Sequence, residues 1–281
     1  MKIEPVVPQR RHTLEFLKEI RAVSPVFLDT EVDMSRVLEH RDARRESGQR
    51  YSPIVYLVYC AARVLAAHPE ANSAILGRRS PRVARFDGVD AKVTLDKRMG
   101  GHRVVLAAVL AGVDTAQLSS IQQHLEQVRD CDPDSAPQFA PTRLLQRVPW
   151  PLRGLLYRRA VRPLRGRAGV FGTFAVTSLG HRAVDGFHSV GGTTVTLGMG
   201  RIAERPVVRA GELAIAPTMR LSLAFDHRVI DGAEAADVLT GIKDALESFR
   251  DPQDPDTPPA GAIGRLPQGR PATNGVPAAS G

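Results

Sequence analysis

Cysteine is scarce in this chain: Cys60 and Cys131 are the only two among 281 residues. Cys60 lies within an apolar helical pattern, so a buried free thiol is expected there rather than a disulfide. The chain also lacks any uninterrupted apolar run of about 18 residues, which argues against a membrane-spanning helix. Residues 1–5 lack the apolar core of a signal peptide. These absences favour a cytoplasmic location.

Metal- and nucleotide-binding spacings are missing as well. The sequence contains no Cys-x-x-Cys, no His-Glu-x-x-His and no Gly-x-x-x-x-Gly-Lys segment. The glycine-rich stretch at 190–194 lacks dinucleotide spacing. We therefore expect no metal and no Rossmann-type nucleotide site.

Acidic residues are absent from one long segment, and this explains the net charge of +8. Between Arg143 and Arg167 the chain carries eight arginines and no Asp or Glu. The remainder is nearly balanced, so we expect a neutral domain with one basic insertion (residues 140–169) and no nucleic-acid partner.

Hydrophobic periodicity predicts an α/β protein in which a mixed sheet is covered by helices. Two adjacent strands are expected around the turn Asp87-Gly88, and the β-branched run 102–111 is expected to be a central strand. An N-cap is expected at Asp114 or Thr115 for the helix that ends near residue 128. Helices are expected over 12–21, 34–47, 52–67, 115–128 and 233–249, and strands over 26–32, 83–86, 89–95, 102–111, 170–177, 193–199, 207–210, 212–215 and 219–225.

The domain boundaries follow from composition. Residues 1–11 read as an N-terminal arm, and residues 12–249 as one domain that carries the basic insertion. Residues 250–281 are rich in Pro, Asp and Gly and lack apolar periodicity, so they are expected to be disordered.

The most informative motif is the sequence Asp-His-Arg-Val-Ile-Asp-Gly over residues 226–232, directly after the alternating run 221–225. Histidine is the side chain whose unperturbed pKa lies near neutrality, so His227 is a candidate base, with Asp231 four residues later as its orienting group. The same pattern fits a solvated His–Asp pair, and Asp231 also fits the N-cap of the next helix.

The segment 221–232 resembles the signature of the catalytic domain of dihydrolipoamide acyltransferases, the core component of 2-oxoacid dehydrogenase complexes. That domain shares its fold with chloramphenicol acetyltransferase. Three further blocks, 27–35, 52–72 and 173–180, resemble the family in the same order. The resemblance covers roughly residues 10 to 248.

This resemblance implies a chloramphenicol acetyltransferase-like α/β sandwich that assembles as a homotrimer or a larger symmetric assembly, with active sites between subunits. It implies acyl transfer between coenzyme A and a lipoyl-type thiol or another small acceptor. His227 would be the general base and Asp231 would hold its surroundings. Thr177, from a neighbouring subunit, would donate a hydrogen bond to the oxyanion, with Ser178 beside it as the alternative. Asp226 and Arg228 are expected to form ion pairs that fix the turn.

Departures from the family pattern leave several alternatives open. The chain begins close to the expected catalytic domain, so a lipoyl group is expected only if another chain supplies it. The stretch 99–104 differs from the family's arrangement near coenzyme A. The basic insertion is expected to be a solvated flap packed on its own domain, a membrane-surface element, or a dock for an acidic carrier protein or coenzyme A phosphates.

Other functions remain alternatives. A non-catalytic trimeric scaffold would keep the fold, and a stand-alone acyltransferase would use an amine or hydroxyl acceptor. The segment 181–186 repeats the His-Arg-x-x-Asp-Gly spacing. We expect it to be a loop of coincidental composition, with a role beside the substrate as the alternative.

Overall fold

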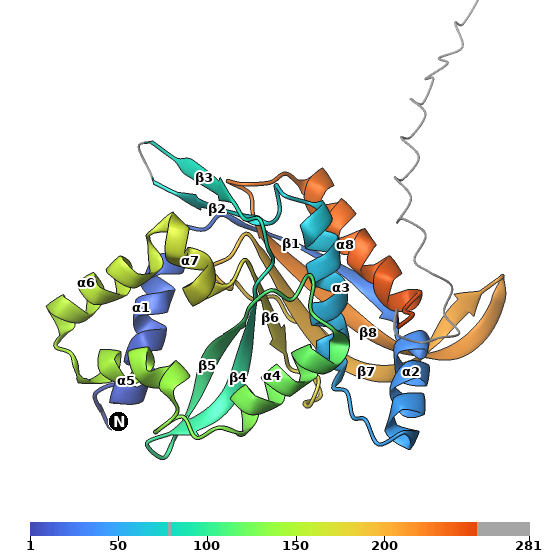
Figure 1. The fold of residues 1–281 in the computed structure, drawn as a ribbon, viewed down its shortest axis with the longest axis horizontal. Coiled ribbons are helices and arrows are strands. Elements are labelled where there is room, and N and C mark those ends of the chain that lie inside the picture. The colour runs from blue at the N-terminus through green and yellow to red at the C-terminus, as the bar shows by residue number, and fades with distance from the viewer. Residues whose placement is uncertain (78–79, 252–281) are drawn as a thin grey trace, which may run out of the picture. The chain divides into compact units, whose positions relative to one another are not determined.

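The computed structural model describes residues 1–77 and 80–251 (Figure 1). The α-helices of this part are α1 (Arg11–Ile20), α2 (Ser35–Glu46), α3 (Pro53–Ala67), α4 (Leu118–Asp130), α5 (Ala140–Arg147), α6 (Trp150–Val161), α7 (Leu164–Phe171) and α8 (Gly232–Glu247). The strands are β1 (Pro25–Asp33), β2 (Ser73–Leu76), β3 (Arg82–Arg85), β4 (Ala91–Met99), β5 (His102–Leu110), β6 (Phe174–Ser178), β7 (Val195–Arg209) and β8 (Glu212–Asp226). Short 3-10 turns lie at Pro8–Arg10 and Pro137–Phe139. The expected tail lies outside the described residues from position 252 onward.

Six strands form one mixed sheet in the order β1-β8-β7-β6-β4-β5. Strand β6 is parallel to both β4 and β7, and the other neighbours are antiparallel. The long β7–β8 hairpin turns at Ala210 and Gly211, which both have positive φ. The expected mixed sheet covered by helices is therefore confirmed.

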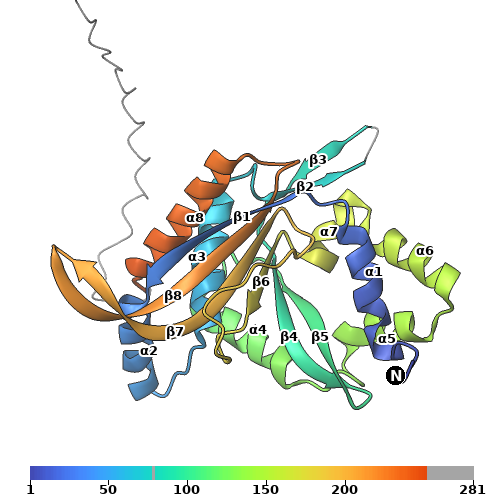
Figure 2. The ribbon, with the colours of Figure 1, turned by 180° about the vertical axis from the view of Figure 1, so that it is seen from behind.

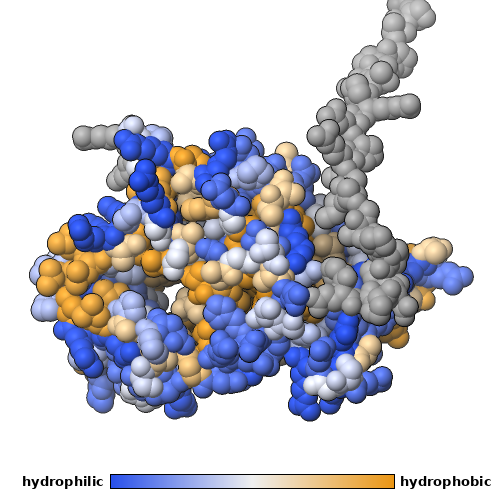
Figure 3. Space-filling model, in the orientation of Figure 1, coloured by the Kyte–Doolittle hydropathy of each residue, from blue (hydrophilic) through white to orange (hydrophobic). Residues whose placement is uncertain are grey.

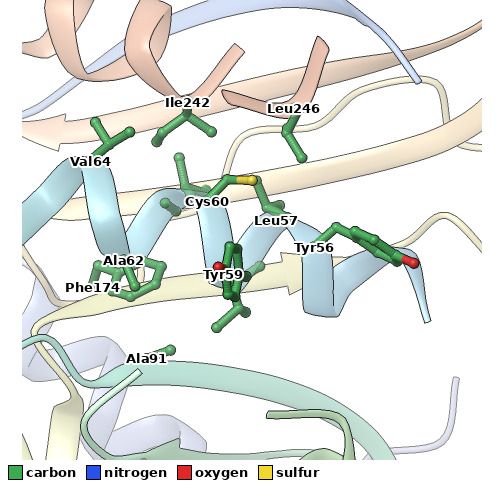
Figure 4. Packing of buried hydrophobic residues seen from close by; sticks show 14 of the residues in the cluster. Tyr56, Leu57, Tyr59, Cys60, Ala62, Val64, Ala91, Phe174, Ile242 and Leu246 are labelled. Atoms are coloured by element: carbon green, nitrogen blue, oxygen red, sulfur yellow. The ribbon is translucent and has the colours of Figure 1, made fainter. Parts of the chain in front are cut away.

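The main core lies between one face of this sheet and helices α3 and α8. Helix α3 is apolar nearly all round because it is covered on both sides. Figure 4 shows Ile242 and Leu246 of α8 on one side of α3, and Phe174 of β6 and Ala91 of β4 on the other. The thiol of Cys60 is buried between these layers and is free, as expected. Burial raises the pKa of this thiol to about 12, so Cys60 is an inert core residue.

Helices α1, α5, α6 and α7, here called the accessory helices, lie together beside β4 and β5, away from α3 and α8 (Figure 2). Three of them are the folded form of the basic insertion. Pro149 and Pro163 precede α6 and α7, where proline ends one helix and allows the next to begin. The insertion is thus a packed helical layer.

Several expectations about single elements are wrong. Strand β5 is an edge strand, although its sequence predicted a central one. Only one of its faces is buried: Val104 and Leu106 pack against α4 and Phe139, while the exposed residues Val105 and Ala107 line a cavity under the accessory helices. Strand β3 pairs with β2 and does not form a hairpin with β4.

Two element ends also differ from expectation. Helix α4 begins after Gln117 without a side-chain cap, so neither Thr115 nor Asp114 caps it. Val170 and Phe171 complete α7 rather than beginning β6. Gly172 lies between α7 and β6 and has a φ of 66°, which favours glycine. A larger residue would also clash there, because a Cβ would lie 2.7 Å from the backbone nitrogen of Lys92.

Candidate active site

His227 stands directly beyond the end of β8. Its backbone N–H donates a hydrogen bond to the carbonyl of Ser24 at 2.9 Å, which ties the residue to the segment before β1. Its ring lies 5.5 Å from the ring of Phe225. The side chain is 47% exposed, so the imidazole can be reached from outside this chain.

The turn that presents His227 is fixed by a charged pair. The buried carboxylate of Asp226 accepts hydrogen bonds from the Nε of Arg228 at 2.8 Å and from the backbone N–H groups of Ser24 and Arg228. The bond to Asp226 raises the pKa of the Arg228 guanidinium. The expected ion pair is therefore present, and it sets the direction in which the chain leaves β8.

Asp231 is the N-cap residue of α8, and its carboxylate Oδ1 lies 3.3 Å from Nδ1 of His227. Its side chain makes no capping hydrogen bond, although its backbone carbonyl accepts from Ala235. Asp231 therefore occupies the expected N-cap position, and only its backbone carbonyl takes part in the cap. The contact with His227 is made by a carboxylate that is 89% exposed.

Thr177 lies near the end of β6, and its hydroxyl has a defined partner. The hydroxyl of Thr94 on β4 donates to Oγ1 of Thr177 at 2.9 Å. This contact uses a lone pair of Thr177 and leaves its own proton free to donate elsewhere. Ser178 points to the opposite face of the strand, where its Oγ accepts a weak bond from Gly180. Of the two hydroxyls, that of Thr177 is therefore the one that can donate its proton to a bound group.

Within one chain His227 and Thr177 lie far apart. Thr177 pairs with Gly198 of β7, whereas His227 lies two residues beyond Phe225, which pairs with Val195. The two residues are thus separated by about five positions along the strands and by two strand spacings, or roughly 20 Å in total. They cannot act on the same atom unless a second copy contributes one of them.

Thr177 opens into a cavity of about 540 Å³ between the sheet and the accessory helices. Lys92 and Thr94 of β4 share its floor with Thr177, because alternate residues of neighbouring strands face the same side. Figure 3 shows a hollow beside the accessory helices with apolar side chains at its rim. Helix α1 covers one side through His12, whose Nε2 lies 3.1 Å from the carbonyl of Val105.

Three titratable groups line this cavity, and burial is the largest influence on each. Burial and the charge of Arg167 lower the pKa of Lys92 to about 7. Burial also lowers the pKa of His12, despite hydrogen bonding that opposes it. Burial raises the pKa of Tyr157 above its ordinary value. Each shift favours the uncharged form.

Sequence reasoning missed these cavity residues. A signal was present for Lys92, since it stands between the apolar residues Ala91 and Val93 in the sequence. Both of these residues are buried in β4. No comparable signal marks His12 or Tyr157, because they reach the cavity only through the packing of α1 and α6.

A second cavity, of about 280 Å³, lies next to the turn that presents His227. Asp226 and Arg228 line it from the turn, and Arg162 and Arg167 line it from the basic insertion. Arg162 lies 3.3 Å from the carboxylate of Glu19, and Arg167 donates to the carbonyl of Gly192 at 2.8 Å. The cavity is therefore rich in guanidinium groups.

The second His-Arg-x-x-Asp-Gly sequence, residues 181–186, is a loop, as expected. Asp185 lies 2.5 Å from Arg201 and 2.9 Å from Arg205, both on β7, and these ion pairs hold the loop against the sheet. Nothing in this arrangement brings His181 to either cavity.

Across residues 1–77 and 80–251, no three His, Cys, Asp or Glu side chains are grouped as metal ligands would be. In the same part of the chain, no helix combines the length and the apolar character that crossing a membrane requires.

Residues 169–253 match the sequence model of the 2-oxoacid dehydrogenase acyltransferase catalytic domain. This match contains Thr177, His227 and Asp231, and it begins where the basic insertion ends. The family expected from the sequence is therefore confirmed over this segment.

Curated relatives match over a short stretch. The acetyltransferase component of the pyruvate dehydrogenase complex of Bacillus subtilis is 56% identical over 57 residues, which are 20% of this chain and 12% of the relative. The succinyltransferase component of the 2-oxoglutarate dehydrogenase complex of Pseudomonas aeruginosa is 52% identical over 54 residues, or 19% of this chain and 13% of the relative. The chain thus matches only about an eighth of each relative's length.

Solved structures show the fold over most of the chain. A probable dihydrolipoamide acetyltransferase from Listeria monocytogenes has a TM-score of 0.67 at 18% identity and covers 92% of this chain and 98% of its own. The dihydrolipoamide acetyltransferase of Azotobacter vinelandii has a TM-score of 0.67 at 20% identity and covers 89% of this chain and 93% of its own. A serine, a histidine and an asparagine four positions after that histidine were investigated for their role in its catalysis.

Proposed function

We propose that this chain is a coenzyme A-dependent acyltransferase whose active site combines His227 of one subunit with Thr177 of another. The observation that carries the proposal is the placement of both groups. The imidazole is half exposed beside a carboxylate, the hydroxyl has an unused proton, and both lie in the segment that matches the acyltransferase family.

His227 would remove the proton from the attacking thiol. A thiol with a pKa of about 8.5 is mostly protonated at neutral pH, and the thiolate is the reactive form. With Asp231 at Nδ1, the tautomer that carries its proton on Nδ1 is favoured, so the lone pair of Nε2 is free to accept the thiol proton. The thiolate sulfur then attacks the thioester carbonyl, and Nε2 returns the proton to the departing sulfur.

Thr177 would stabilise the oxyanion formed in this attack. The hydrogen bond from Thr94 fixes the position of Oγ1, so the free proton of Thr177 is held by the sheet before substrate arrives. A preorganised donor of this kind contributes on the order of 3 kcal/mol to the transition state.

The positions of the proposed residues agree with the pattern studied in the Azotobacter protein. Asp231 follows His227 by four residues, as the asparagine follows the histidine there. A carboxylate in place of an amide would add charge stabilisation to the imidazolium. Thr177 would take the place of the serine and supply the same hydroxyl.

The separation of His227 and Thr177 within one chain supports a symmetric assembly in which each interface forms a site. A homotrimer is the smallest closed ring of this kind that the family resemblance implies. A larger cage built from such units is the alternative, since one solved relative is the cubic core of a pyruvate dehydrogenase complex. A cytoplasmic location also stays a prediction.

Coenzyme A is the proposed thiol or thioester substrate, and the arginine-rich second cavity is the proposed place for its phosphates. Arg162, Arg167 and Arg228 gather there within reach of the turn that carries His227. A lipoyl group carried by another chain is the proposed partner thiol. A small amine or hydroxyl acceptor is the alternative.

The direct test is transfer of an acetyl group from acetyl-coenzyme A to dihydrolipoamide, followed by mass spectrometry. We expect His227→Ala to lower kcat by about a thousandfold while assembly is unchanged. His124→Ala, on the exposed face of α4, is the matched control and should retain activity. Equal turnover by the two variants would remove His227 from the mechanism.

A non-catalytic scaffold is the second candidate. It would account for assembly without any need for a hydroxyl aimed into a cavity. Calorimetry with coenzyme A separates the two, because a scaffold should show no binding while the acyltransferase should bind with a measurable heat.

The outer surface of the basic insertion offers a further contact. Trp150 and Leu152 are 70% and 50% exposed, on a segment whose charged residues are all arginines. We propose a membrane surface as one partner and an acidic carrier protein as the alternative. Sedimentation with anionic liposomes should be weakened in W150S, whereas a carrier would bind without lipid.

A further inference from the structure

The cavity at Thr177 is walled mainly by apolar side chains. The sheet supplies Val105 and Ala107, and the accessory helices supply aliphatic residues from the other side. The lining from the helices includes Phe16, Leu144, Leu145, Leu156, Ala160, Val161, Val170 and Phe171. Most of these residues belong to the insertion or adjoin it, so the cavity depends on the insertion.

The lysine that lines this cavity is bound by the protein itself. The ammonium of Lys92 donates to the carbonyl of Gly191 and lies 5.0 Å and 4.4 Å from the ring centroids of Phe16 and Phe171. Among the described residues, no carboxylate forms an ion pair with it. His12 and Tyr157 are biased toward their neutral forms by burial. The cavity therefore presents little charge to a ligand.

We propose that this cavity binds the apolar chain of a medium-length acyl group, whose thioester carbonyl lies at Thr177. This inference rests on the proposed function, since it names the acyl group for that same site. At roughly 30 Å³ for a group the size of water or a methylene, 540 Å³ accommodates an unbranched chain on the order of ten carbons with space to spare. Apolar walls stabilise such a chain through burial of its surface.

Shorter and charged acyl groups fit this cavity less well. An acetyl group would leave most of the volume to water, which has few polar partners there. An acyl group that ends in a second carboxylate would need a positive partner. Lys92 and His12 are the candidates among the residues that line the cavity. Burial disfavours the charged form of both, and Lys92 is already bound to Gly191 and the two rings.

The test measures binding apart from chemistry. In the His227→Ala protein, calorimetry is performed with acetyl-, hexanoyl- and decanoyl-coenzyme A, and with a decanoyl analogue that carries a terminal carboxylate. We expect decanoyl-coenzyme A to bind at least tenfold more tightly than acetyl-coenzyme A, which corresponds to about 1.4 kcal/mol. The carboxylate-terminated analogue should bind more weakly than decanoyl-coenzyme A.

Two neighbouring residues of α6 give a matched pair of variants. Leu156 lines the cavity and Leu155 does not. L156W should abolish the preference for the longer chain, whereas L155W should keep it. Ala107→Phe fills the cavity from β5 and gives a second measurement if L156W disturbs the packing of α6.

Failure of this inference and failure of the proposed function give different results. Equal binding of all chain lengths, with acetyl transfer still dependent on His227, overturns the cavity assignment alone. Preferred binding of the carboxylate-terminated analogue overturns it in favour of a dicarboxylic acyl group held by Lys92. Absence of binding and turnover with every acyl-coenzyme A overturns both.

Discussion

The carboxylate of Glu15 on α1 accepts a hydrogen bond from Nε of Arg153 on α6 at 3.1 Å, and the two side chains are only 5% and 9% exposed. This pair joins the start of the domain to the middle of the basic insertion. Lys18 adds a second contact to the same carboxylate at 3.0 Å. The buried arginine shows that α6 packs on its own domain, as expected for a flap of this kind.

Loss of this pair should destabilise the protein. Glu15→Gln leaves the Arg153 guanidinium buried without its counter-charge, and removing one partner of a buried pair costs about 3 kcal/mol or more. Chemical denaturation measures the change in the free energy of unfolding. Glu39→Gln is the control, because the Arg36–Glu39 pair on α2 is exposed and its loss should change this free energy by less than about 1 kcal/mol.

Lys92 should make stability depend on pH above neutrality. Burial lowers its pKa from 10.5 to about 7, so between these values the unfolded chain binds more protons than the folded chain. The burial penalty is complete below pH 7 and fades as pH rises toward 10.5, so the free energy of unfolding should rise over this window. Lys92→Met should flatten this rise. Lys2→Met, at an exposed terminal residue, should leave the slope unchanged.

The oxyanion role of Thr177 depends on its hydroxyl. Thr177→Val keeps the shape of the side chain but removes the donor, and kcat for acetyl transfer should fall by about a hundredfold or more. Thr177→Ser restores the donor and should keep most of the activity. If the valine variant keeps full activity, the hydroxyl is not needed and the oxyanion role of Thr177 is wrong.

If each active site is shared between two subunits, two variants that are inactive alone should restore activity when they assemble together. His227→Ala and Thr177→Val should each be inactive alone. When the two chains are co-expressed and form mixed assemblies, some interfaces combine an intact His227 with an intact Thr177. Activity should then return to a substantial fraction of that of the native protein. Mixed assemblies, verified by two affinity tags, that stay inactive would show that both groups must come from one chain.

Local sequence determined much of this structure. The alternating run before His227 forms β8, the alanine-rich stretch after Asp231 forms α8, and the turn between them is held by Asp226 and Arg228 as their charges predicted. The apolar stretch after Ser52 forms the buried helix α3. These features depend on residues that are close in sequence, where periodicity and charge spacing act directly.

Long-range packing decided what periodicity could not. The apolar, β-branched run of β5 predicted a central strand, whereas the strand lies at the edge of the sheet with one face buried. The arginines from Arg143 to Arg167 predicted the positive charge of the insertion. They did not predict the cavity at Thr177, which exists because the insertion packs near α1 and the sheet. The separation of His227 from Thr177 likewise depends on strand order. It arises because β7 separates β6 from β8 and the two residues lie at opposite ends of their pairing with it, a relationship that no local pattern encodes.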